Sequence, residues 1–391
     1  MSLVLISALK IGFSVVTPAS FDLQGIVELA TLDRLIGPWI VLYPPLYFAS
    51  NSTVLQSWTV STPTGMDIGL RFLSLLMRLP IFIFDLGTLV ILYYIGKRLK
   101  SPVEGRIAAL LWFMNPYSFL SIELLGVPDI LATFFVMAAI LMILYNRPRF
   151  CGIFLGLGIW IKLYPVLLLP PLLMFIQQHG VSRREKAFVL VIGLIGLIGY
   201  MLWTLPYGTL YLTGYYSPVT QLLPFVGGDY SVNGAAFGLI IFYCIVALFA
   251  KKTSSPIATM LQTLLVFYAL SNWSFYVQYL TWALPLMALD IALCNRRRAI
   301  LLPAICAFLF VQWFFLSAGL ATPSGYSLFL VNLASGSASS IAIKNLLNNQ
   351  FVQVFAAPII SSAGFACMLI YVIDVAGSWF MKSSDAANRS A

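Results

Sequence analysis

Long apolar runs alternate with short polar segments along this chain of 391 residues. Lys and Arg gather in the polar segments, at residues 97–106, 147–149, 183–186, 251–252 and 296–298. A membrane-crossing helix needs about 20 apolar residues, so the intervening runs predict roughly ten to twelve membrane segments. Clusters of Lys and Arg are typical of cytoplasmic loops. The opposite loops are then extracytoplasmic, at about residues 18–66, 116–128, 205–232, 270–277 and 321–350.

The composition supports this pattern. Hydrophobic residues make up 61% of the chain and charged residues only 9%, with a mean hydropathy of +0.95. We therefore expect an all-α polytopic protein of the plasma membrane or the endoplasmic reticulum, with residues 1–391 forming a single membrane domain. The net charge of +9 is explained by the cytoplasmic loops, and no nucleic acid is expected as a partner.

One segment is too short for a simple count of crossings. Residues 151–178 lie between two basic clusters that must share a side of the membrane, yet two full crossings need about 40 residues. The sequence predicts a pair of short helices that enters and returns, with its turn near Lys162 and Pro165. Proline favours the break because it removes a backbone donor and clashes with the preceding turn.

The predicted topology collects polar side chains on the extracytoplasmic half. They are Asp22, Glu28, Asp33, Asp67, Asp85, Glu123, Asp129, Lys162 and Asp229. A carrier would more often place such groups near the midplane, open to both sides. Ionisable groups at membrane depth are costly and tend to have a function, so this half is the candidate site.

The first outer loop, residues 18–66, combines isolated acids with aromatic residues and prolines, a composition typical of interfacial helices. Within it Asp22 is the strongest candidate base, although an Asp before an apolar run also commonly caps a helix. Asp129 has the same two interpretations, since an acid at a helix start complements the helix dipole.

Lys162 has no acid near it in the sequence. It could reach the interface, pair with Asp129 or Asp85, or hold an anionic group such as a lipid phosphate. Gln278 and Tyr279 enter a predicted membrane segment from the same outer side. The chain has one histidine and five scattered cysteines, so the sequence predicts no metal site.

Four motifs occur in an order that resembles a known family. They are Asn115-Pro116-Tyr117, Gly126-Val127-Pro128-Asp129, Ile161-Lys162-Leu163-Tyr164-Pro165 and Gln278-Tyr279-Leu280-Thr281-Trp282. Together they resemble the catalytic subunit of GPI mannosyltransferase I and related polyprenyl-phosphate-dependent hexosyltransferases of the GT-C class. Asp22 stands at the place of that family's catalytic acid. The resemblance covers roughly residues 20–290 and implies a GT-C-like bundle of about twelve membrane segments, including the short pair.

The resemblance implies an enzyme that moves a hexose, expected to be mannose, from a polyprenyl-phosphate donor to a glycolipid or protein acceptor on the extracytoplasmic or lumenal face. Asp22 would deprotonate the acceptor hydroxyl. Lys162 and Tyr164 would hold the donor phosphate, a step that a water-poor site strengthens. Asp129, Tyr43, Gln278 and Tyr279 would contact the substrates. The lipid-linked sugar would be a co-substrate, with no other cofactor assigned.

The chain departs from that family in the first loop. Relatives commonly carry an Asp-x-Asp-Tyr-like pair of acids, whereas Phe21-Asp22-Leu23 has no acid two residues before Asp22. The departure leaves dependence on a divalent metal open. It also leaves two alternatives: a non-catalytic subunit of GPI transamidase, which shares this fold, and a carrier for a lipid or small anion. Either the transferase or the subunit could have a small membrane partner.

Overall fold

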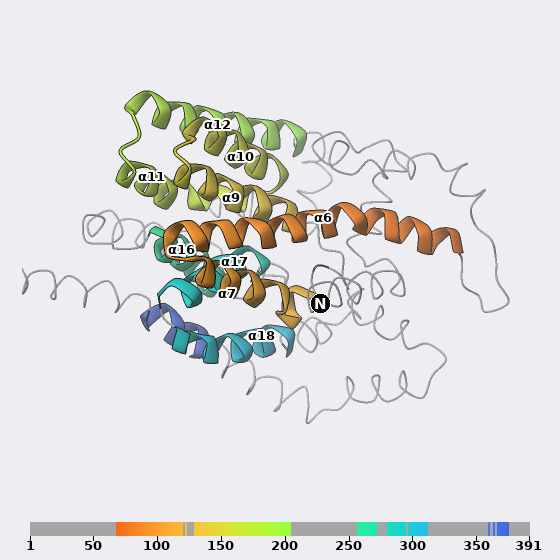
Figure 1. The fold of residues 1–391 in the computed structure, drawn as a ribbon. Helices are drawn as coiled ribbons and strands as arrows, with labels where there is room; N and C mark the ends of the chain where they lie inside the picture. The colour runs from red at the N-terminus through yellow and green to blue at the C-terminus, as the bar shows by residue number, and fades with distance from the viewer. Residues whose placement is uncertain are drawn as a thin grey trace, which may run out of the picture. The chain divides into compact units, whose positions relative to one another are not determined.

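The computed structural model describes residues 68–119, 122, 129–204, 256–271, 280–294, 296–311, 359, 363 and 366–374. This part of the chain is helical and contains no strand, which confirms the all-α prediction for these residues (Figure 1). Two of its helices are long and apolar enough to cross a membrane, over Arg78–Leu99 and Arg183–Leu202. The count of about twelve segments stays a prediction, and the first loop, residues 18–66, lies outside the described residues.

The elements follow one another along the chain as helices joined by short turns. They are α6 (Ile68–Leu99), α7 (Pro102–Phe113), α8 (Pro116–Ser118), α9 (Asp129–Leu144), α10 (Pro148–Ile161), η2 (Tyr164–Leu168), α11 (Leu169–Gln178), α12 (Arg183–Thr204), α16 (Pro256–Ser271), α17 (Leu280–Leu293), η5 (Arg296–Ile300) and α18 (Leu301–Val311). A further helix covers residues 366–374.

Contacts divide the chain into two compact units. The first comprises Met1–Gly87, Phe113–Leu131 and Ala304–Gly364, and the second comprises Thr88–Trp112, Ala132–Pro303 and Phe365–Ala391. In the second unit, α16 packs against α11, η2 and α17. The described side chains of α16 are almost all buried, and so are those of α17 up to its last residue. These two helices therefore form the centre of the second unit.

Two helices begin with the same local signal. Ser101 precedes α7 and Ser182 precedes α12, each followed three residues later by a glutamate. The Ser182 hydroxyl accepts a hydrogen bond from the backbone N–H of Glu185 at 3.3 Å and donates one to its carboxylate at 3.0 Å. At α7, the Ser101 hydroxyl accepts from the N–H of Val103 and donates to Glu104. Such capping pairs satisfy donors that the first turn leaves without partners.

Helices α10 and α12 run parallel and in very close contact. A Cβ added to Gly152 would lie 3.1 Å from the Cα of Val189, and one added to Gly196 would overlap the carbonyl oxygen of Gly156. Further along both helices, Gly199 faces Trp160. Small residues spaced like Gly152 and Gly156 let helix backbones approach closely in a membrane. Because both helices start at the same end, the chain between them must return to that end.

The return begins with a break at Lys162. Its backbone is extended, with φ −147° and ψ 145°, and its N–H closes the last turn of α10 on the carbonyl of Gly158 at 3.0 Å. The short helix η2 follows, with Pro165 in its first turn, and α11 then leads back. The interval predicted as a short helix pair, residues 151–178, thus contains α11 and nearly all of α10. Its placement within a membrane stays a prediction.

Candidate functional site

Tyr164 is the predicted site residue whose contacts are described most fully. It is buried in η2, where its hydroxyl donates a hydrogen bond to the hydroxyl oxygen of Thr133 at 3.0 Å. Its ring stacks on that of Trp282, with 4.2 Å between centroids and 7° between planes. Tyr164 therefore joins η2 to α9 and α17, a packing role that the sequence did not predict.

The other two described site residues lie in different units. Asp129 is the first residue of α9, in the first unit, and is 2% exposed. Lys162 is half-buried at the end of α10, in the second unit. Their convergence on one cavity stays a prediction. Asp22, Tyr43, Gln278 and Tyr279 lie outside the described residues.

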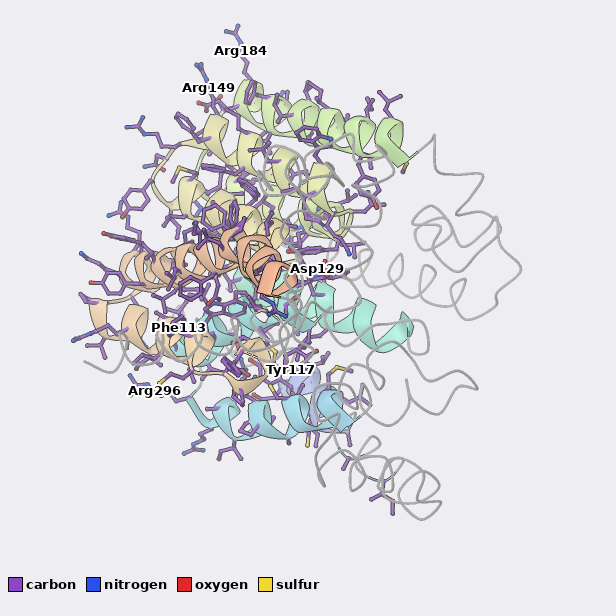
Figure 2. The ribbon with its side chains drawn as sticks, turned by 90° about the vertical axis from the view of Figure 1, so that its right-hand side faces the viewer. Phe113, Tyr117, Asp129, Arg149, Arg184 and Arg296 are labelled. Atoms are coloured by element: carbon purple, nitrogen blue, oxygen red, sulfur yellow. The ribbon has the colours of Figure 1, made fainter. Side chains whose placement is uncertain are left out.

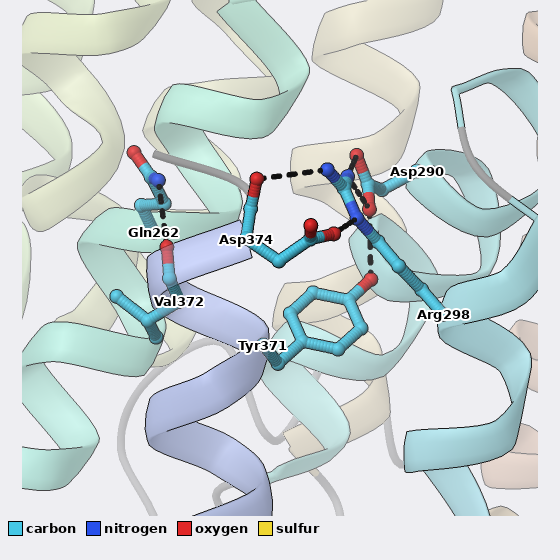
Figure 3. A network of polar contacts seen from close by, with 6 residues as sticks. All are labelled: Gln262, Asp290, Arg298, Tyr371, Val372 and Asp374. Carbon is cyan, nitrogen blue, oxygen red and sulfur yellow. Dashed lines mark hydrogen bonds and ion pairs between the residues drawn. The ribbon is translucent and has the colours of Figure 1, made fainter. Parts of the chain in front are cut away.

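A network around a buried arginine lies elsewhere in the second unit (Figure 3). Arg298 of η5 donates through Nη1 to both carboxylate oxygens of Asp290 in α17, at 2.9 and 2.7 Å. Its Nε donates to the carboxylate of Asp374 at 2.5 Å, and its Nη2 to the carbonyl of Asp374 at 3.2 Å. Tyr371 donates its hydroxyl to Asp290 at 2.8 Å. The network fastens residues 366–374 to α17 and η5.

Burial makes this network costly to disturb. Asp290 and Arg298 are 1% and 4% exposed, whereas the side chain of Asp374 is 44% exposed. Burial alone would lower the pKa of Arg298, but the hydrogen bonds and charges of Asp374 and Asp290 outweigh it and raise that pKa above its ordinary value. The guanidinium therefore stays charged, and each buried carboxylate oxygen of Asp290 has a donor.

A second group of charges surrounds Glu104 at the start of α7. Lys100 and Arg296 approach its carboxylate to 3.4 and 3.6 Å. The pKa of Glu104 lies below its ordinary value, chiefly because the Ser101 hydroxyl donates to the carboxylate, with smaller contributions from its own backbone N–H and from Lys100. The carboxylate is thus ionised at neutral pH and anchors the turns after α6 and α17.

Three basic residues each donate to a backbone carbonyl of a helix in the second unit. Arg98 and Lys100 reach the last residues of α9 and α17, Leu144 at 3.4 Å and Leu293 at 3.3 Å, and Arg298 reaches Asp374, the last described residue of its helix. Positive charges are favourable there because the last carbonyls carry the negative end of the helix dipole. The contacts bring the basic segments after α6, α9 and α17 together, and their location on the cytoplasmic side stays a prediction.

Sequence reasoning missed this role for the basic residues. It explained Arg298 only as part of a basic cytoplasmic loop, and it predicted no role for Asp290 or Asp374. One signal was present, because Asp290 is the only acid in the otherwise apolar helix α17 and precedes three consecutive arginines by six residues. A lone acid in such a helix needs a partner.

The predicted sidedness can be tested with Cys294, an exposed thiol directly after α17. In sealed vesicles whose cytoplasmic face points outward, a membrane-impermeant maleimide is expected to label Cys294 without detergent. Mass spectrometry identifies the labelled cysteine. The loss of labelling in the variant Cys294→Ser shows how much of the total labelling belongs to Cys294. Labelling of Cys294 only after detergent has permeabilised the vesicles would place the basic segments on the extracytoplasmic side.

The described residues hold no group of three or more His, Cys, Asp or Glu that could bind a metal ion. What they contain is a set of apolar helices, two of them long enough to span a bilayer, and one ion pair with both partners buried. These features are consistent with the class of helical membrane proteins. A sequence model of the family described as "GPI transamidase subunit PIG-U" matches residues 39–233. No curated protein sequence matches the chain significantly.

This match corrects the expectation of a mannosyltransferase. Members of the matched family are described as subunits of a transamidase and not as glycosyltransferases. The prediction of a hexosyltransferase is therefore wrong. The alternative of a GPI transamidase subunit fits the match better. Asp22, Lys162 and the other site residues stay predicted positions of interest, but they lose their roles in sugar transfer.

Proposed function

We propose that this protein is a non-catalytic, multi-pass subunit of a GPI transamidase complex in the endoplasmic reticulum membrane. The observation that carries the proposal is the match of residues 39–233 to the family of GPI transamidase subunit PIG-U. The departure of the first loop from the two-acid pattern of the transferases agrees with it, because a subunit without sugar-transfer chemistry does not need those acids.

The contacts of the described residues support a role in assembly. Tyr164, expected to hold a donor phosphate, uses its hydroxyl and ring for contacts within the second unit. One face of α12 packs closely on α10, whereas Leu194, Ile195 and Ile198 on that helix are each more than half exposed. Such an apolar face is suited to lipid or to the membrane helices of partner subunits.

The proposal is tested by purifying the tagged protein from membranes in a mild detergent. We expect it to bring down other membrane proteins together with transamidase activity, measured as the transfer of a reporter protein to a GPI anchor. A tagged membrane protein of the same organelle, unrelated in sequence, is the control. Depleting the protein should lower the surface level of GPI-anchored reporters and leave transmembrane reporters unchanged.

Two results would contradict the proposal. One is a purified protein that elutes alone and carries no transamidase activity under conditions that keep other membrane complexes intact. The other is normal anchoring of the GPI reporters after depletion. Transfer of mannose from a polyprenyl-phosphate donor by the purified protein would restore the glycosyltransferase interpretation.

A further inference from the structure

Four exposed arginines lie at the same end of two packed helices in the second unit. Arg147 and Arg149 flank the first residue of α10, and Arg183 and Arg184 begin α12. We call these four the arginine cluster. The parallel contact of α10 with α12 brings both pairs to the same end, one to two turns before Gly152 meets Val189. Figure 2 shows Arg149 and Arg184 extending away from the helices at the same edge of the structure.

The sequence of the helices that carry the cluster has little negative charge to balance it. Glu185 is the only acid between residues 132 and 204, and its carboxylate accepts a hydrogen bond from Ser182 in the cap of α12. None of the four arginine side chains makes a hydrogen bond or ion pair with another residue that the structure describes, unlike the side chains of Arg98, Lys100 and Arg298. The helix dipoles add to the repulsion, because both helix starts are positive. A bound anion would relieve it.

The position of the cluster specifies the kind of anion. Arg183 is the first residue of a helix long enough to cross a membrane, Arg183–Leu202, so its guanidinium lies at the depth of the lipid headgroups. The leaflet at the cytoplasmic surface carries anionic phospholipids, and arginine binds phosphate oxygens through paired donors. We propose that the arginine cluster binds the phosphate of an anionic phospholipid headgroup. This inference does not depend on the proposed function.

The experiment compares two variants that remove the same charge. The full-length protein is placed in nanodiscs of phosphatidylcholine with a fluorescent phosphatidylserine, and binding is measured as energy transfer from protein tryptophan. An arginine near the surface strengthens such binding by about fivefold. The double variant Arg149→Gln/Arg184→Gln is therefore expected to weaken phosphatidylserine binding by more than tenfold. The matched control Lys97→Gln/Arg106→Gln removes two exposed cations that do not stand at a helix start, so it should weaken binding by a clearly smaller factor.

Further measurements identify the ligand and test whether the variants are folded. Arg149→Lys/Arg184→Lys should retain part of the affinity, and 0.5 M salt should weaken wild-type binding because these charges are exposed. Soluble glycerophosphoserine should not compete, since the lipid is held at the interface. Thermal unfolding in a neutral detergent shows whether the glutamine variants are folded. Equal loss in both double variants, equal binding of labelled phosphatidylcholine, or competition by the soluble headgroup would overturn the proposal.

Discussion

Replacing Arg298 by methionine is expected to destabilise the protein by about 3–5 kcal/mol, the range for removing one partner of a buried ion pair. Asp290 is 1% exposed and receives two hydrogen bonds from Arg298, so the variant leaves a buried carboxylate whose remaining donor among the described residues is Tyr371. The carbonyl of Asp374 loses its donor as well. Thermal unfolding of the detergent-purified protein, followed by the loss of the monodisperse peak in size-exclusion chromatography, measures the effect.

A matched control lies two residues earlier in the same short helix. The side chain of Arg296 is 64% exposed and pairs with Glu104 at 3.6 Å, so Arg296→Met should cost no more than about 1 kcal/mol. The double variant Asp290→Leu/Arg298→Met removes both buried charges and should be more stable than Arg298→Met alone. If Arg298→Met unfolds at the wild-type temperature, or if the double variant is the least stable of all, the network does not anchor residues 366–374.

The sequence predicted the helical class, because it depends on local patterns, and the break that the structure has at Lys162 also has a local signal. Apolar runs of sufficient length determine helices in a membrane, and Pro165 with Pro170 and Pro171 marks a break regardless of what surrounds it. The contact of Arg298 with Asp374 could not be predicted in this way. These residues are 76 positions apart, and only the packing of residues 366–374 against α17 brings them together.

Three residues of the motifs that suggested a mannosyltransferase have structural roles in the described part of the chain. The side chain of Asn115 accepts a hydrogen bond from the N–H of Tyr117 at 2.8 Å and caps the short helix α8. Tyr164 packs on Trp282, which belongs to the last of the four motifs. Residues that hold a fold together are retained by proteins that share the fold without sharing its chemistry. An ordered set of such motifs therefore indicates a fold more reliably than an activity.

The contact between α10 and α12 leads to a prediction with a control in the same helix. Gly196→Ala is expected to destabilise the protein by about 1–3 kcal/mol, the usual cost of overpacking. The new Cβ would overlap the carbonyl oxygen of Gly156, a backbone atom that cannot rotate away, so the two helices would have to separate. Gly193→Ala changes the same helix by the same group but meets only side-chain atoms at 3.7 and 3.8 Å. It should be neutral or stabilising, since alanine favours a helix by up to about 1 kcal/mol over glycine.

The same contact predicts how two substitutions combine. A Cβ added to Gly156 would lie 2.8 Å from Cγ2 of Ile192 and 2.9 Å from its carbonyl oxygen, so Gly156→Ala alone should also be costly. Once Gly196→Ala has forced the helices apart, the second methyl group has more room, and the two losses should add to less than their sum. Thermal unfolding of the two single variants and the double variant measures this coupling. Full additivity would mean that the helices do not separate, and equal stability of Gly193→Ala and Gly196→Ala would mean that the backbones are not in contact.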